Sequence, residues 1–167
     1  SGIEGKIDGL RRGRSLVLES DHTVILGWSS KIVTAVQELV IANENQPKAA
    51  VVILANHDKV EMEEELYSRV TKLGNTKIVC RRGDPCVLSD LEIVRPEFAK
   101  SIILFSSEDE QGDAVVLKRA LALQRVAERH NNNCHIVAEI RDDTTAAAIK
   151  LVGNVEVGQS VDLVTRV

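Results

Sequence analysis

The chain has 167 residues, which is enough for one domain with a sizeable buried core. Its formal net charge of −4 argues against a general nucleic-acid-binding surface, and no apolar run reaches the roughly 18 residues that a membrane-spanning helix needs. Aromatic residues make up only 2% of the sequence, so the core must be built from aliphatic side chains. Such a core is typical of buried parallel strands covered by helices.

The three cysteines, Cys80, Cys86 and Cys134, show no paired spacing. An odd, unpatterned set of this kind indicates a reducing compartment such as the cytosol. The chain begins without methionine and stops just after an apolar run, so we expect it to be a fragment of a larger protein.

Short apolar runs alternate along the chain with longer stretches of helical character. The predicted strands cover residues 22–26, 49–54, 76–80, 101–105, 134–140 and 155–157. The first predicted helix follows Ser29 or Ser30, either of which supplies a capping hydroxyl. The later helices are predicted over residues 61–73, 87–94, 113–129 and 144–151. This alternation predicts an α/β fold with a doubly wound, mainly parallel sheet.

The predicted helix 113–129 carries more apolar residues than a helix on one face of a sheet needs. Apolar side chains cover more than one of its sides, and the stretch 144–149 is similarly small and apolar. Deep burial within one molecule is one explanation of this surplus. A surface that binds another protein is the explanation we favour.

In a doubly wound sheet, ligands bind beyond the carboxyl ends of the strands, near the switch in strand order. The first such loop reads Gly27-Trp28-Ser29-Ser30-Lys31, so it lacks the glycine pattern of a dinucleotide site. A helix N-terminus with two hydroxyls and a lysine still suits an anion. The predicted ligand site comprises Gly27, Trp28, Ser29, Ser30, Asn56, Arg82, Gly83 and Asp84. For three of these residues a structural role is the alternative: Gly83 and Asp84 as turn residues, and Trp28 as a filler of the crevice.

Acidic residues follow several predicted strands. Asp58 stands close to where NAD sites place an acid against the ribose, and it is equally suited to cap the following helix. Acids at the start of helix 113–129 are typical of helix-dipole stabilisation, so a metal site at Asp109, Asp113 and Glu139 is the minor alternative. No nucleophile has a plausible neighbouring base, and we therefore do not expect an enzyme.

Several short motifs resemble those of one known family. Residues 24–29 (VILGWS), 83–85 (GDP), 88–91 (LSDL) and 99–104 (AKSIIL) resemble the RCK domains, which regulate the conductance of potassium channels. Residues 10–15, 25–29 and 41–43 are most similar to the Castor and Pollux ion-channel subfamily. The spacing between the motifs also agrees, and the resemblance covers nearly the whole chain.

The resemblance implies a Rossmann-like RCK domain in residues 21–158, a linker from the pore in residues 1–20 and the start of a truncated crossover helix in residues 159–167. It also implies a gating ring on the cytosolic face of a tetrameric cation channel, serving potassium or calcium-related transport. The domain would contact its own pore domain and neighbouring RCK domains, and it would bind no nucleic acid. The membrane would be a bacterial plasma membrane or, in a plant, the nuclear envelope.

The resemblance leaves the gating ligand open between calcium and a nucleotide of the NAD or ATP type. In calcium-gated members, the ligating acids match Phe105, Glu139 and Arg141 here, and of these only Glu139 is a carboxylate. Two other hypotheses also stay open. The chain could be an NAD-binding domain of a dehydrogenase-like enzyme, or a ring subunit with a purely structural role and no ligand.

Overall fold

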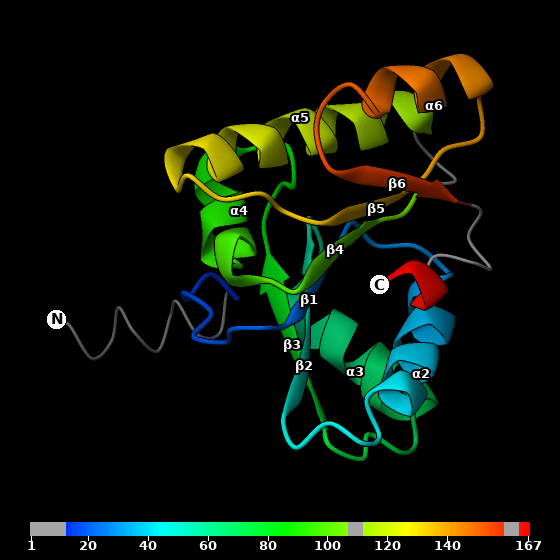
Figure 1. Cartoon of the computed structure of the whole chain (residues 1–167). Coiled ribbons are helices and arrows are strands. Elements are labelled where there is room, and N and C mark those ends of the chain that lie inside the picture. The colour runs from blue at the N-terminus through cyan, green and yellow to red at the C-terminus, as the bar shows by residue number, and fades with distance from the viewer. Residues whose placement is uncertain (1–12, 107–111, 159–163) are drawn as a thin grey trace, which may run out of the picture.

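One parallel sheet forms the centre of the fold. The structure is a computed structural model that describes residues 13–106, 112–158 and 164–167. Within these residues, six parallel strands follow the order β3-β2-β1-β4-β5-β6 (Figure 1). The strands are β1 (Thr23–Leu26), β2 (Ala49–Ala55), β3 (Thr76–Arg82), β4 (Ser101–Leu104), β5 (Ile136–Glu139) and β6 (Val155–Gly158). The predicted α/β fold with a doubly wound parallel sheet is confirmed.

Helices cover both faces of the sheet (Figure 1). On one face lie α2 (Ile32–Ala42) and α3 (Lys59–Arg69); on the other lie α4 (Leu88–Ile93), α5 (Asp113–Arg129) and α6 (Asp143–Ile149). Successive side chains of a strand point to opposite faces. Ile25 therefore packs in the core with α2 and α3, whereas Val24 and Leu26 pack in the core with α4 and α5. Two short 3-10 helices, η1 (Pro96–Phe98) and η2 (Val164–Arg166), complete the described elements.

The largest difference from the predicted elements lies at α3. The Asp58 carboxylate accepts hydrogen bonds from the backbone N–H groups of Val60 (2.9 Å) and Glu61 (3.2 Å), so the helix begins at Lys59, earlier than predicted. The helix ends at Arg69, because the next residue is extended and buries its side chain in the core. Of the two roles considered for Asp58, the structure shows the helix cap.

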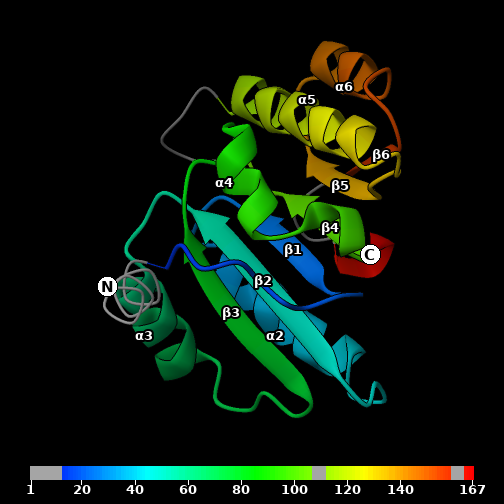
Figure 2. The ribbon, with the colours of Figure 1, turned by 90° about the vertical axis from the view of Figure 1, so that its left-hand side faces the viewer.

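Residues 13–22 cross the α4 side of the sheet before β1 begins. Figure 2 shows this segment in blue, passing in front of β3 and β2. Val17 is buried in the core with α4 and α5, and its N–H donates to the carbonyl of Ile93 at 2.9 Å. The described part of the expected linker therefore packs against the domain. The boundaries at residues 20 and 158 stay predictions, as does the crossover helix, because residues 1–12 and 159–163 lie outside the described residues.

Apolar side chains reach the surface on the α5 and α6 side of the molecule. Leu121 on α5 is 49% exposed and Leu151, just after α6, is 89% exposed, although the inner side of α5 is fully buried. Part of the apolar surplus predicted for α5 is thus exposed on the described chain. None of the described helices is long and apolar enough to cross a bilayer.

The buried His22 makes the stability of the fold depend on pH. Burial lowers the pKa of His22 from 6.5, against the opposing effect of its hydrogen bond to the Val94 carbonyl (2.8 Å). The unfolded chain therefore binds more protons than the folded chain below about pH 6.5, and acid favours unfolding. We expect the free energy of unfolding to fall as the pH decreases through this range, and to fall less in His22→Gln. Denaturant titrations at pH 7.5 and 5.5 give the change in unfolding free energy between the two pH values for each protein. An equal change in the unaltered protein and in His22→Gln would contradict the prediction.

Candidate functional site

The carboxyl ends of β1, β4 and β5 lie side by side in the middle of the sheet. These strands are paired in register up to Leu26, Leu104 and Ala138. The next residues along each strand, which therefore come close together, are Gly27, Phe105 and Glu139. From this point α2 leaves toward one face of the sheet and α5 toward the other (Figure 1). This is the switch in strand order where doubly wound folds bind ligands.

Gly27 makes the turn out of β1 with a backbone conformation that favours glycine. Its φ is +96°, and its N–H donates to the carbonyl of Leu54 at 2.9 Å. Arg119 reaches this turn from α5. A Cβ placed on Gly27 would lie 2.6 Å from Nη1 and 3.3 Å from Cζ of Arg119, so the guanidinium lies directly against the glycine backbone. Close approach by phosphate is the usual reason for glycine in this loop, and here a cationic side chain takes that position.

Arg119 was not among the site residues predicted from the sequence. It lies on the buried side of α5 between Val116 and Leu123 and is only 8% exposed. A charged residue within the apolar stripe of a helix was the available signal, because such a residue is rarely buried without a function or a partner. The apolar character of the neighbouring residues concealed that signal.

A second cation at the switch point is paired with a buried carboxylate. Lys31, the residue before α2, places its Nζ 2.5 Å from Oε1 of Glu139 at the end of β5. The Glu139 side chain is 5% exposed, and Nη2 of Arg141 lies 3.9 Å from the same oxygen. Its other oxygen, Oε2, is buried and has no hydrogen-bond partner among the described residues. The pair therefore ties α2 to β5 across the end of β4.

We call Gly27, Lys31, Ser106, Arg119 and Glu139 the switch-point cluster. Ser106 follows β4, and its hydroxyl is buried without a hydrogen-bond partner in the described part of the chain. Among the described residues of this cluster, two side chains are basic and one is a carboxylate, and the N-terminal end of α2 adds positive potential beside Lys31. Anion binding at this loop, expected from Lys31 and the helix N-terminus, stays a prediction.

The structure brings the first part of the predicted ligand set together. Gly27, Trp28, Ser29 and Ser30 form one loop, and the Trp28 ring lies 6.1 Å from that of His57, beside Asn56 in the loop after β2. The Ser29 hydroxyl accepts a hydrogen bond from the N–H of Lys31 at 3.3 Å. The residue at the cap of α2 is Lys31, and its side chain makes no capping hydrogen bond, so the prediction that Ser29 or Ser30 caps this helix is wrong. Asn56 and Ser30 are exposed at this end of the sheet.

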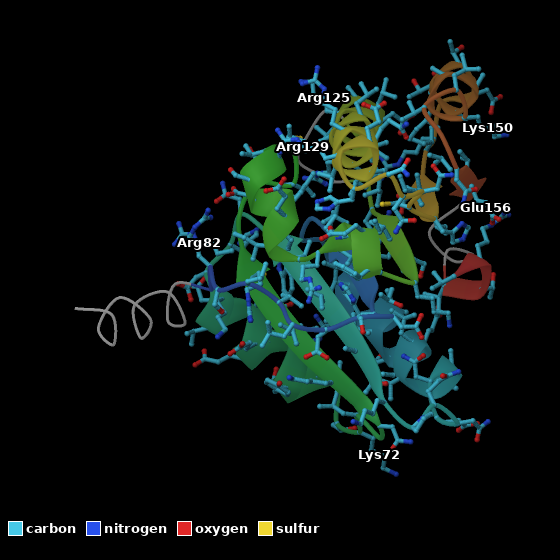
Figure 3. All side chains as sticks on the ribbon, turned by 60° about the vertical axis from the view of Figure 1, so that its left-hand side comes forward. Lys72, Arg82, Arg125, Arg129, Lys150 and Glu156 are labelled. Carbon is cyan, nitrogen blue, oxygen red and sulfur yellow. The ribbon has the colours of Figure 1, made fainter. Side chains whose placement is uncertain are left out.

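The second part, Arg82, Gly83 and Asp84, makes the turn between β3 and α4. Gly83 donates to the carbonyl of Ala55 (3.0 Å), and Asp84 accepts from the N–H of Cys86 (2.8 Å). These contacts are the turn role considered for Gly83 and Asp84. The Arg82 side chain is exposed at the outer edge of the molecule (Figure 3). A single ligand contacting all eight predicted residues stays a prediction.

The metal site at Asp109, Asp113 and Glu139 also stays a prediction, since Asp109 lies outside the described residues. The Asp113 carboxylate accepts hydrogen bonds from the N–H groups of Arg141 and Asp142 at 2.7–3.1 Å, and Glu139 is paired with Lys31. In residues 13–106, 112–158 and 164–167, no group of three or more His, Cys, Asp or Glu is arranged to hold a metal ion.

The contact between Arg119 and Gly27 predicts an unequal effect of two glycine substitutions. Gly74 also has a positive φ, +53°, but a Cβ there would meet no atom within 4 Å. We expect Gly74→Ala to cost about 1–2 kcal/mol from backbone strain alone. Gly27→Ala must also displace the buried guanidinium, and we expect about 2–4 kcal/mol. Denaturant unfolding measures both, and equal losses would show that Arg119 moves aside freely.

Comparisons with known proteins place the chain among channel sequences. No protein-family model matches it. Over 153 residues, or 90% of the chain, it is 39% identical to the probable ion channel CASTOR of Oryza sativa subsp. japonica and to the probable ion channel POLLUX of Arabidopsis thaliana. It is 37% identical to the ion channel CASTOR of Lotus japonicus over the same length. The chain spans only 17% or 18% of the length of these relatives.

Solved structures of channel regulatory domains share the fold. The GsuK channel bound to NAD matches 84% of this chain and 22% of that one, with a TM-score of 0.58 and 16% identity. The human SLO3 gating ring matches 81% of this chain and 24% of that one, with a TM-score of 0.55 and 15% identity. The chain therefore has the fold found in channel gating rings and is similar over most of its length to the Castor and Pollux ion channels, which confirms the predicted resemblance to their RCK domain.

Proposed function

We propose that the chain is a regulatory domain of a cation channel, and that an anionic ligand bound at the switch-point cluster is the signal it senses. The observation that carries the proposal is the buried guanidinium of Arg119 against the Gly27 turn, with Lys31 in the same loop. The sequence relatives are named ion channels, which supports the channel role. The same relatives favour a domain that is not an enzyme.

Anion binding is supported by the positive charge that the described residues bring to this loop. An anion at the N-terminal end of α2 would be stabilised both by the positive end of the helix dipole and by the ammonium of Lys31. Lys31 would then be shared between the ligand and Glu139, so binding would change the contact between α2 and β5.

Gating requires that the ligand prefer one conformation of the ring. A ligand shifts a two-state equilibrium only by the difference in its affinity for the two states. To move the population from 1:99 to 99:1, that difference must be about 10⁴-fold. The Lys31–Glu139 pair is a suitable place for such a difference in ligand affinity, because it joins the start of α2 to the end of β5.

The exposed apolar side chains of α5 and α6 support assembly with neighbouring domains. Leu121 on α5 and Leu151 just after α6 are large exposed apolar residues, and the small residues Ala147 and Ala148 on α6 are exposed as well. Exposed apolar residues can serve as protein–protein contacts when they join into a patch. In the proposed channel, this surface faces the next domain of a tetrameric ring on the cytosolic side of the membrane. The ion would be potassium or one linked to calcium transport.

A nucleotide is the first anion to test, since the GsuK channel was solved with NAD. We expect isothermal titration of the channel protein carrying this chain to detect ATP or NAD. Lys31→Gln should weaken the binding about 10-fold or more, because a charge-assisted hydrogen bond is lost. Because Lys31→Gln leaves Glu139 unpaired, the double variant Lys31→Gln/Glu139→Gln shows whether lost binding reflects the missing cation or a strained fold.

Arg69→Gln is the matched control for this titration. Arg69 is an exposed basic residue that pairs with Glu65 on the same helix, far from the switch point in the chain. Its variant should bind like the unaltered protein. Saturable binding of calcium with none of ATP, ADP, NAD or NADH would overturn the anion proposal and return attention to Asp109, Asp113 and Glu139. Binding of no probe would favour a structural ring subunit.

A further inference from the structure

Residues 13–22 are attached to the domain at several successive points. The bonds join the Gly13 carbonyl to the N–H of Arg82 (2.8 Å), the Ser15 carbonyl to Nε of Arg81 (2.7 Å), the N–H of Val17 to Ile93 (2.9 Å) and the N–H of Asp21 to Phe98 (2.8 Å). Two of the attachments are to the end of β3, and two are to α4 and η1. Under the proposed function, this segment is the described part of the expected linker from the pore.

Gly13 fixes where the segment enters the domain. Its φ is +71°, and it is buried between the start of α3 and the end of β3. A Cβ there would lie 2.8 Å from Cβ of Lys59 and 3.2 Å from the backbone N of Arg82. Both neighbouring atoms are close to the main chain and cannot swing away, so only glycine fits. The entry point is therefore a close backbone contact with β3.

Arg14 and Asp90 connect this entry point to the turn between β3 and α4. The Arg14 guanidinium donates to the Asp90 carboxylate (2.7 Å) and to the carbonyl of Arg82 (3.1 Å). The other oxygen of Asp90 accepts from the N–H of Asp84 at 2.8 Å. Partial burial raises the pKa of Asp90, but the hydrogen bonds from Arg14 and Asp84 outweigh it, and the net pKa is lowered. One carboxylate thus holds the segment and the turn together.

The turn is in contact with the switch-point cluster through the end of β2. Gly83 donates to Ala55, and a Cβ on it would lie 3.0 Å from Cδ1 of Leu54. The carbonyl of Leu54 in turn accepts the N–H of Gly27. Gly27 is therefore linked to the turn through Leu54 and Ala55, two adjacent residues of β2.

We propose that Asp90 and Arg14 are positioning residues that make segment 13–22 follow movements of the switch-point loop. The inference rests on the proposed gating function. Energetic coupling between two places in a protein is measured as the interaction between changes made at each of them. The proposal therefore predicts that a change at Gly27 alters the protection of segment 13–22, and that it does so only while the Arg14–Asp90 contact is intact.

Hydrogen exchange on the channel protein carrying this chain measures the attachment. Arg14→Gln and Asp90→Asn should speed hydrogen exchange at the N–H groups of Val17 and Arg82 by about 5- to 20-fold. Arg14→Lys should have a smaller effect, because it keeps the charge but not both hydrogen bonds of the guanidinium. Arg129→Gln is the matched control. It removes an ion pair of similar length, 2.8 Å, from α4 to α5 on the outer surface (Figure 3). Unchanged exchange in Arg14→Gln would overturn the proposal.

A double-mutant cycle measures the coupling without any ligand. When Arg14 is present, Gly27→Ala should change the hydrogen-exchange rate at the N–H of Val17. In the Arg14→Gln background, the same substitution should have at least about 3-fold less effect on that rate. Gly74→Ala should leave the rate unchanged in both backgrounds. If Gly27→Ala fails to fold, Lys31→Gln takes its place in the cycle. Equal effects in the two backgrounds would mean that Arg14 and Asp90 only hold the segment, and would overturn the inference.

Channel currents separate this inference from the proposed function. We expect Arg14→Gln to change the open probability in planar bilayers, and Arg129→Gln to leave it unchanged. An unchanged open probability in Arg14→Gln, together with faster exchange, would overturn the coupling role. If neither ATP, NAD nor calcium changes the currents of the unaltered channel, the proposed function fails, but the exchange cycle still reports whether the two ends are coupled.

Discussion

The parallel pairing of β1 on both of its edges is the constraint on which the rest of the structure depends. This four-residue strand lies between β2 and β4, and its side chains enter both cores in alternation. Because β2 and β4 extend the sheet to opposite sides, the connections that leave β1 and β4 must go to opposite faces. The start of α2 and the start of α5 therefore meet at one end of the sheet, and Arg119 and Lys31 are brought to the same turn.

Charge at this end of the sheet is supplied and balanced by the chain itself. Glu139 is almost fully buried, and an unpaired carboxylate there would be costly. The Lys31 ammonium, at the start of α2, compensates this charge, so the partner of Glu139 belongs to the same chain. The position that a glycine-rich loop usually leaves open for phosphate is similarly covered by a guanidinium. The site thus resembles a Rossmann ligand site in its backbone and differs from one in its electrostatics.

Periodicity in the sequence predicted the strands and helices whose buried faces are aliphatic. The bounds of α5 and the order of strands and helices followed from runs such as 49–54 and from the apolar positions of residues 113–129. The end of α3 did not, because Val70 is apolar in any conformation and only the tertiary core decides that it is extended. The grouping of Lys31 with Glu139 joins residues 108 positions apart, and no local pattern encodes such a contact.

Arg82 and Asp84 were predicted to lie with the ligand loop because the carboxyl ends of all parallel strands face the same way. The N–H of Asp84 instead donates to Asp90, and the carbonyl of Arg82 accepts from Arg14, contacts that strand ends alone do not reveal.

The in-register pairing of β3 with β2 over seven residues has a mechanical consequence. Segment 13–22 enters the domain where Gly13 bonds the end of β3 and Arg14 bonds Asp90 of α4, so a pull from the N-terminal side would act on both elements. A force directed along a strand loads all the hydrogen bonds of its ladder together, whereas a force across the ladder would open them one at a time. The seven-residue ladder is longer than the four-residue pairing of β1 with β4. The N-terminal segment is therefore attached to the strand whose described pairing is the longest in the sheet, and a force directed along that strand would be shared by the whole ladder.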